Sequence, residues 1–87
     1  MNMEKNQLQK QIREYIDEMI FGGNPPQTFT NDTPLISTRI MDSIVTLKLI
    51  AHFEEKLGVE FRAHEVTAEN LDTVNIIADF LLRKLSR

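Results

Sequence analysis

The stretch SIVTLKLIAHFEEKL, residues 43–57, does more to decide the fold than any other part of this 87-residue chain. Its apolar residues recur at spacings of three and four, which predicts a helix. Because a helix turns about 100° per residue, one group of these side chains gathers on a single side. That group consists of Leu49, Ile50, Phe53 and Leu57. It is typical of a stripe that faces a hydrophobic core.

A second, narrower apolar stripe lies on nearly the opposite side of this helix, and it consists of Ile44, Leu47 and Ala51. The residues that border it are Lys48, Glu54 and Glu55. In one interpretation the preceding loop folds over the stripe, with Ile36, Ile40 or Met41 as cover. In the other interpretation the stripe is a docking face for partner proteins. The pattern leaves both open, since the loop can cover one end and expose the other.

Before this segment the sequence predicts one helix and one long loop. The helix is expected over about residues 3–21, and Gly22-Gly23 followed by two prolines ends it. Residues 24–42 contain three prolines and no sustained period, so they are expected to form a loop. Leu35, Ile36 and Ile40 punctuate this loop, which indicates that it packs onto the core.

After this segment Gly58 ends the helix, and a short extended piece is expected at residues 59–61. A brief third helix is expected over residues 63–66 or 68–71. A last helix begins after Asp72 or Thr73 and runs nearly to the end of the chain. The sequence therefore predicts an all-α protein, a four-helix bundle in one domain over residues 1–87, with three longer helices, one short helix and a long first loop.

The composition excludes several classes of function. No cysteine is present, so disulfides and cysteine nucleophiles are excluded, and His52 and His64 have no further ligands at metal-binding spacing. The net charge is −3, which argues against a nucleic-acid binder, and the basic residues at the C-terminus, Arg83, Lys84 and Arg87, suit a solvated helix end. No apolar run is long enough to span a bilayer, and no signal peptide is evident, so a cytoplasmic location is expected.

Ser43 stands at the start of the helix predicted over residues 43–57, and its role there has two interpretations. In the simpler one, Asp42 or Ser43 caps the backbone N–H groups of the first turn. In the other, the exposed serine beside the second apolar stripe carries a phosphate-linked group, because a helix N-terminus accommodates a phosphate well.

The motif MDSI at residues 41–44, the helix that follows it, and GVEF at residues 58–61 together resemble the signature of the acyl and peptidyl carrier proteins. LDTV at residues 71–74 resembles the entry into the last helix of that family, and PLI at residues 34–36 resembles the loop before its motif. The resemblance extends over about residues 35–82.

The resemblance implies that Ser43 accepts a 4′-phosphopantetheine arm from coenzyme A through a phosphopantetheinyl transferase, with Asp42 as the acidic residue of the motif. The arm's thiol holds an acyl or aminoacyl group as a thioester, so the chain is expected to be a monomeric carrier and not an enzyme. The positions expected to face the transferase and the loading and condensing enzymes are Met41, Ile44, Leu47, Lys48 and Ala51. Met41 also suits packing in the loop or at the mouth of a cavity.

The chain departs from the family pattern on the early turns of this helix. Fatty-acid carriers usually place acidic residues there, whereas this chain has Val45, Thr46 and Lys48. The usual glycine before the motif is also missing, since residues 38–40 are Thr-Arg-Ile. These departures favour a dedicated carrier in a polyketide, nonribosomal peptide or modified acyl pathway.

Two further hypotheses follow from the same residues. The bundle could be a protein-binding module without a prosthetic group, which docks through Ile44, Leu47 and Ala51. If it is a carrier, its core could open between the second and last helices to shelter a bound chain. The positions expected to line such an opening are Leu49, Phe53 and Ile77.

Overall fold

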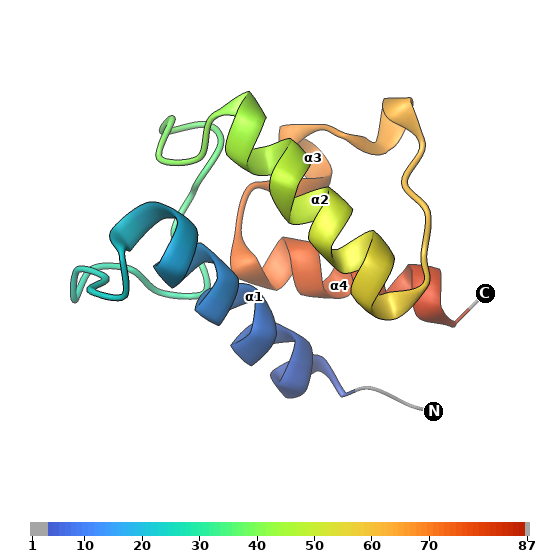
Figure 1. Cartoon of the computed structure of the whole chain (residues 1–87), viewed down its shortest axis with the longest axis horizontal. Helices are drawn as coiled ribbons and strands as arrows, with labels where there is room; N and C mark the ends of the chain where they lie inside the picture. The colour runs from blue at the N-terminus through green and yellow to red at the C-terminus, as the bar shows by residue number, and fades with distance from the viewer. Residues whose placement is uncertain (1–3, 87) are drawn as a thin grey trace.

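The computed structural model of the protein describes residues 4–86, and within that range it contains helices and no strand. Its elements are α1 (Lys5–Phe21), α2 (Ser43–Leu57), the 3₁₀ turn η1 (Ala63–Glu65), α3 (Ala68–Leu71) and α4 (Val74–Leu85), as Figure 1 shows. The expected all-α bundle is therefore confirmed. The two candidate positions for the short third helix are both occupied, one by η1 and the other by α3. Met3, where the first helix was expected to begin, lies outside the described residues.

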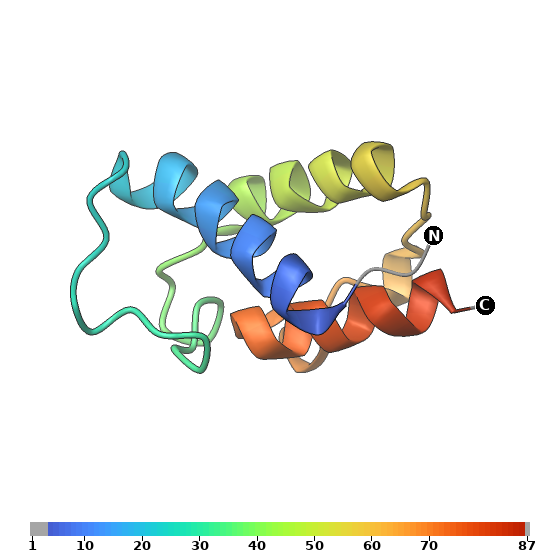
Figure 2. The same cartoon turned by 90° about the horizontal axis from the view of Figure 1, so that it is seen from below.

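The helices enclose one hydrophobic core. α1 packs against both α2 and α4, and the short α3 packs against α4 (Figure 2). The buried core side chains of the helices are Leu8, Ile12, Ile16, Leu49, Ile50, Phe53, Leu71, Val74, Ile77, Ala78 and Leu81. The core stripe predicted for α2 is confirmed, with Leu57 only partly buried at its edge.

The helix ends follow the local chemistry that the sequence contains. α1 and α2 both end at a glycine in the left-handed conformation, Gly22 with φ 58° and Gly58 with φ 66°, which other residues adopt only at a cost. At the start of α4 the Thr73 hydroxyl oxygen accepts a hydrogen bond from the Ile76 amide at 3.0 Å. These contacts fix where each helix stops and where the connecting segments leave.

The long loop between α1 and α2 is held against the bundle by Asp72, the residue between α3 and α4. One oxygen of its carboxylate accepts hydrogen bonds from the backbone amides of Leu35, Ile36 and Ser37 at 3.1, 2.8 and 3.0 Å. The other oxygen accepts one from the Ser37 hydroxyl at 2.9 Å. Burial raises the pKa of Asp72, but these hydrogen bonds together outweigh it and leave the pKa lowered. The expectation of a packed loop is confirmed.

The loop's other half is anchored to α1. The Arg13 guanidinium donates hydrogen bonds to the side chain of Asn31 at 3.1 Å and to the carbonyl of Phe29 at 3.2 Å, and it also lies over the Phe29 ring. The Met41 amide donates to the Leu35 carbonyl at 2.8 Å and thereby closes the loop just before α2. The start of α2 is therefore fixed from two directions.

Candidate functional site

Asp42, and not Ser43, caps α2. The Asp42 carboxylate accepts a hydrogen bond from the Val45 amide at 2.8 Å, and the Thr46 hydroxyl donates to the Asp42 carbonyl at 2.7 Å. The Ser43 hydroxyl makes no hydrogen bond with any residue in the range 4–86, and Ser43 is exposed. The choice that the sequence left open is thus resolved: the capping is done by Asp42, and the serine oxygen has no structural partner in the described chain.

Backbone donors lie beside this oxygen. Within the described residues, the amides of Ser43 and Ile44 donate to no acceptor, because they precede the first hydrogen bond of the helix, which the Thr46 amide donates to the Asp42 carbonyl. Unpaired amides at a helix N-terminus stabilise an anion through direct hydrogen bonds and through the helix dipole. The local geometry therefore suits a phosphate ester on the Ser43 oxygen.

The second apolar stripe of α2 is uncovered. Ile44 is 63% exposed and Leu47 is 59% exposed, the largest values among the exposed large apolar residues of the described chain. The loop does not fold over them: Ile36 packs against the core, and Ile40 is itself exposed. Of the two interpretations of the stripe, the structure therefore supports an open surface.

Met41 departs from the expectation that it belongs to the partner face. Its side chain is 1% exposed and is part of the hydrophobic core, because the loop turns inward at this residue before α2 begins. The packing role that the sequence also allowed is the correct one. The exposed face next to Ser43 consists of Ile44, Leu47, Lys48 and Ala51.

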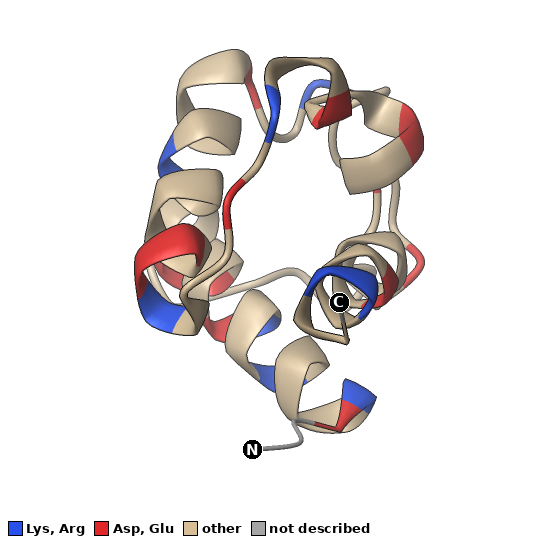
Figure 3. Cartoon of the chain, turned by 90° about the vertical axis from the view of Figure 1, so that its right-hand side faces the viewer, with Lys and Arg blue, Asp and Glu red and all other residues tan. Residues whose placement is uncertain are grey.

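Of the three residues Val45, Thr46 and Lys48 on the early turns of α2, only Lys48 belongs to this exposed face. Val45 packs partly against the core and Thr46 is buried, whereas Lys48 is exposed. The charged residues of α2 are concentrated at its C-terminal end, where Glu54, Glu55 and Lys56 follow one another. Figure 3 colours the acidic and basic positions of the whole described chain. The half of the helix nearer to Ser43 has one charge, and that charge is positive.

A pocket of about 260 Å³ opens directly beside Ser43, between α2 and α3. Its wall is mainly apolar and includes Ile36, Met41, Leu47, Val66, Ala68 and Leu71, with Asp42, Ser43, Thr46 and Thr67 as its polar residues. The sequence instead suggested an opening near Leu49, Phe53 and Ile77. Those three side chains are buried in the core and do not line this pocket. Sequence reasoning missed the α3 wall because nothing local indicates which helix lies opposite Ser43.

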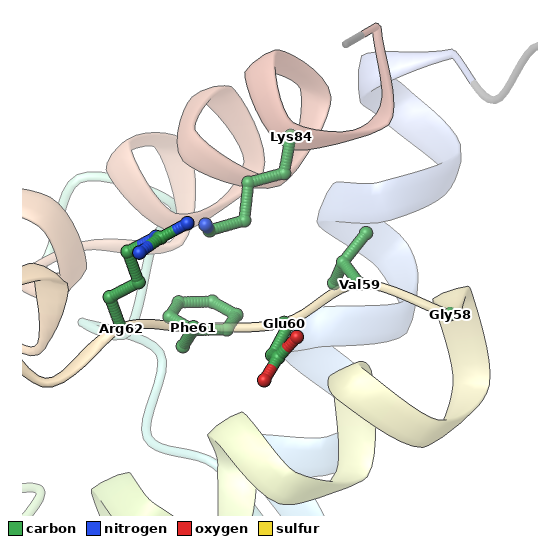
Figure 4. A pocket seen from close by; sticks show the side chains of 6 residues that line it. All are labelled: Gly58, Val59, Glu60, Phe61, Arg62 and Lys84. Carbon is green, nitrogen blue, oxygen red and sulfur yellow. The ribbon is translucent and has the colours of Figure 1, made fainter.

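The opposite end of α2 contains a second, more polar pocket, which Figure 4 shows with Arg62 and Lys84 extending toward one another above Phe61. The Lys84 ammonium also donates a hydrogen bond to the Glu65 carboxylate at 2.7 Å, and the two side chains are only 7% and 10% exposed. This hydrogen bond, with a further one from the Arg62 amide, lowers the pKa of Glu65. The expectation of a solvated Lys84 was wrong, because the chain brings an acid from η1 onto this lysine. Arg87 lies outside the described residues.

Neither histidine lies in a cluster of possible metal ligands within residues 4–86. His52 is exposed and stacks on Tyr15, with ring centroids 4.5 Å apart, and residues 4–86 contain no cluster of three or more His, Cys, Asp or Glu suited to a metal ion. Glu54, which borders the second apolar stripe, accepts a hydrogen bond from the Phe61 amide at 2.8 Å. It therefore holds the segment after α2 in place.

Comparison with known proteins adds no assignment: no family model matches the chain, and no curated protein matches it. None of the described helices is both long enough and apolar enough to cross a membrane.

Proposed function

We propose that this protein is a carrier that holds an acyl or aminoacyl intermediate as a thioester on a 4′-phosphopantetheine arm attached to Ser43. One observation carries the proposal: the Asp42 carboxylate caps α2 at 2.8 Å, so the exposed Ser43 hydroxyl next to it has no partner within residues 4–86. A serine that only stabilised the helix would hold the cap itself. The resemblance of residues 35–82 to carrier proteins supplies the chemistry of the arm.

Three features around Ser43 suit this role. The unpaired amides of Ser43 and Ile44 can bind the phosphate of the arm. The apolar pocket beside Ser43 can hold the first part of the arm or a small apolar cargo. The exposed side chains of Ile44 and Leu47 can contact the transferase and the loading and condensing enzymes. The reactive thiol belongs to the arm and the catalytic groups belong to the partners, so the chain itself needs no active site.

The exposed Lys48, in place of an acidic residue, supports a dedicated carrier in a specialised pathway over a general fatty-acid carrier, because charge at a docking face mainly sets which partners associate quickly. We expect the carrier to act as a monomer in the cytoplasm.

The test is the intact mass of the protein after incubation with coenzyme A, magnesium and a broad-specificity phosphopantetheinyl transferase. Wild type should gain the mass of one phosphopantetheine and Ser43→Ala should gain none. Ser86→Ala is the matched control, since Ser86 is also exposed but bonds back to its own helix, and it should be modified like wild type.

If several transferases leave wild type unmodified, the carrier proposal is wrong. The exposure of Ile44 and Leu47 then favours the second candidate function, a protein-binding module without a prosthetic group. That module would keep its partner when Ser43 is replaced by alanine.

A further inference from the structure

Arg39, in the loop that leads into α2, has a backbone conformation that its side chain disfavours. Its φ is 62°, and it is the only non-glycine residue in the described chain with a positive φ. In this region the β-carbon crowds the following carbonyl, so glycine or asparagine is the usual occupant. Strained residues of this kind persist where the surrounding structure holds them, and they cluster at functional sites. The loop is held here, since the Arg39 amide donates to the Ile36 carbonyl at 3.0 Å.

Nothing within residues 4–86 explains why the residue at this position is an arginine. Arg39 is exposed, and its guanidinium forms no hydrogen bond, ion pair or aromatic contact with the described residues. A glycine would satisfy the backbone without strain. The exposed guanidinium is therefore available to a partner outside the described chain.

Lys48 on α2 is also an exposed cation that has no partner within the described residues. It is exposed and forms no ion pair within the described residues, and its neighbours one turn away are Ile44 and His52, so no acid on α2 pairs with it. Arg39 precedes the exposed apolar residues and Lys48 borders them. In a chain of net charge −3, the only acidic residue in the segment 39–50 is Asp42, which is engaged in the cap.

The sign of the charge reverses at the other end of α2. A shallow hollow there is lined by Ala51, Gly58 and Val59 together with three acids, Glu54, Glu55 and Glu60. The outer face of α2 therefore has a cationic, apolar half near Ser43 and an acidic half beyond Ala51. A complementary partner must match both halves, and this fixes its orientation along the helix.

We propose that the exposed face of Ile44, Leu47 and Lys48, together with Arg39 in the loop before α2, docks on a partner surface that offers an apolar cleft rimmed by carboxylates. Ile44 and Leu47 fill the cleft, and Arg39 and Lys48 pair with the carboxylates. The same partner places cations against the acidic half of the helix. The inference rests on the proposed function, in which this face receives the partner enzymes, and it names the chemistry of the partner that the carrier selects.

The probes are two short synthetic amphipathic peptides with the same leucine face, one with glutamates and the other with lysines on the opposite face. Backbone amide shifts of the ¹⁵N-labelled protein are followed during titration at low and at physiological salt. The glutamate peptide should shift the amides of residues 39–51. The lysine peptide should shift those of residues 54–60. Added salt should weaken both.

Two charge-reversal variants distinguish an effect of this docking face from an effect of the protein's net charge. Lys48→Glu should weaken binding of the glutamate peptide about fivefold or more, because it places like charges opposite one another. Lys56→Glu is the matched control: it changes the net charge equally, but Lys56 lines the groove between α1 and α2 on another side of the helix. That variant should weaken binding less than about twofold.

Replacing Arg39 should change stability and binding in opposite directions, which replacing a residue with a purely structural role would not do. Arg39→Gly should raise the midpoint of thermal unfolding by about 2–4 °C, because it relieves the strain, while it weakens binding of the glutamate peptide. Arg39→Lys should restore binding without the gain in stability. Equal effects of Lys48→Glu and Lys56→Glu, or preferential binding of the lysine peptide at residues 39–51, would overturn the proposal. The titration needs no modified serine, so its failure leaves the carrier proposal standing, and an unmodified Ser43 leaves the titration interpretable.

Discussion

The two ends of α2 differ in how completely their polar groups are paired. At the C-terminal end, the Glu54 carboxylate accepts a hydrogen bond from the Phe61 amide, and nearby Lys84 is paired with Glu65, with both side chains largely buried. At the N-terminal end, the Ser43 hydroxyl has no partner in residues 4–86, and Ile44 next to it is largely exposed. Paired and buried groups stabilise the fold, whereas unpaired and exposed groups add little to its stability and are available to a ligand. The difference separates the paired groups that help to hold the bundle together from the unpaired groups around Ser43 that are available to other molecules.

Two leucines of α2 should show the largest contrast. Leu49 is buried at 1% exposure and Leu47 is 59% exposed, although only one residue separates them. Leu49→Ala should lower the free energy of unfolding by about 3 kcal/mol, because it removes core contacts and leaves a cavity. Leu47→Ala should change it by about 0.5 kcal/mol or less. Urea unfolding followed by circular dichroism measures both. Similar losses would mean that Leu47 packs against the fold and that the face is not open.

Much of the fold follows from local patterns in the sequence. The spacing of Leu49 and Phe53 predicts the buried side of α2, and Gly22 and Gly58 mark the ends of helices at the residues where the chain turns. Part of the candidate site could be predicted in the same way, because Ser43, Ile44 and Leu47 are close together in the sequence and lie on one helix. The helical period, the capping residues and the conformation of glycine depend on residues that are close together in the chain, so they can be predicted from a single sequence.

What the sequence does not predict depends on contacts between distant residues. The sequence predicts that Lys84 is a solvated cation at a helix end, but in the folded chain it forms an ion pair with Glu65. Asp72 looks like a helix cap, but its carboxylate binds amides of Leu35 to Ser37, far earlier in the chain. The residue type of Arg39 gives no indication of its left-handed backbone conformation. Each of these features arises only when the loop and the helices have assembled.

The contact that holds the loop to the bundle should show the next largest effect. Asp72→Asn removes the charge that three amides and the Ser37 hydroxyl bind, so it should lower the free energy of unfolding at pH 7 by about 1–2 kcal/mol. Asp79→Asn is the matched control, since Asp79 forms only an exposed ion pair with Lys5, and it should have little effect. Urea unfolding at pH 7 compares the two variants.

The pH dependence of this effect has a defined sign. The folded-state pKa of Asp72 lies below the ordinary value of 3.8, so its contribution to stability is complete only at a pH well above 3.8, where the carboxylate is ionised in both the folded and the unfolded state. As the pH falls through the lowered pKa, the carboxylate is protonated and the contribution disappears. The gap in stability between wild type and Asp72→Asn should therefore be constant above about pH 5 and shrink below pH 4. A gap that widens in acid would show that the hydrogen bonds to the charged carboxylate do not anchor the loop.

The cap of α2 gives the smallest effect and connects the two ends of the comparison. Asp42→Ala should lower the free energy of unfolding by about 1 kcal/mol, whereas Asp42→Asn should cost about half of that, since asparagine caps nearly as well but lacks the charge that the helix dipole favours. If Asp42 acts on function only by holding the helix end that presents Ser43, the rate of Ser43 modification by a transferase should follow the same order, with Asp42→Asn close to wild type. Unfolding free energies and initial rates of mass gain are measured on the same three proteins. An Asp42→Asn protein that is stable but modified as slowly as Asp42→Ala would mean that partner enzymes bind the carboxylate itself, which would then belong to the docking face as well as to the fold.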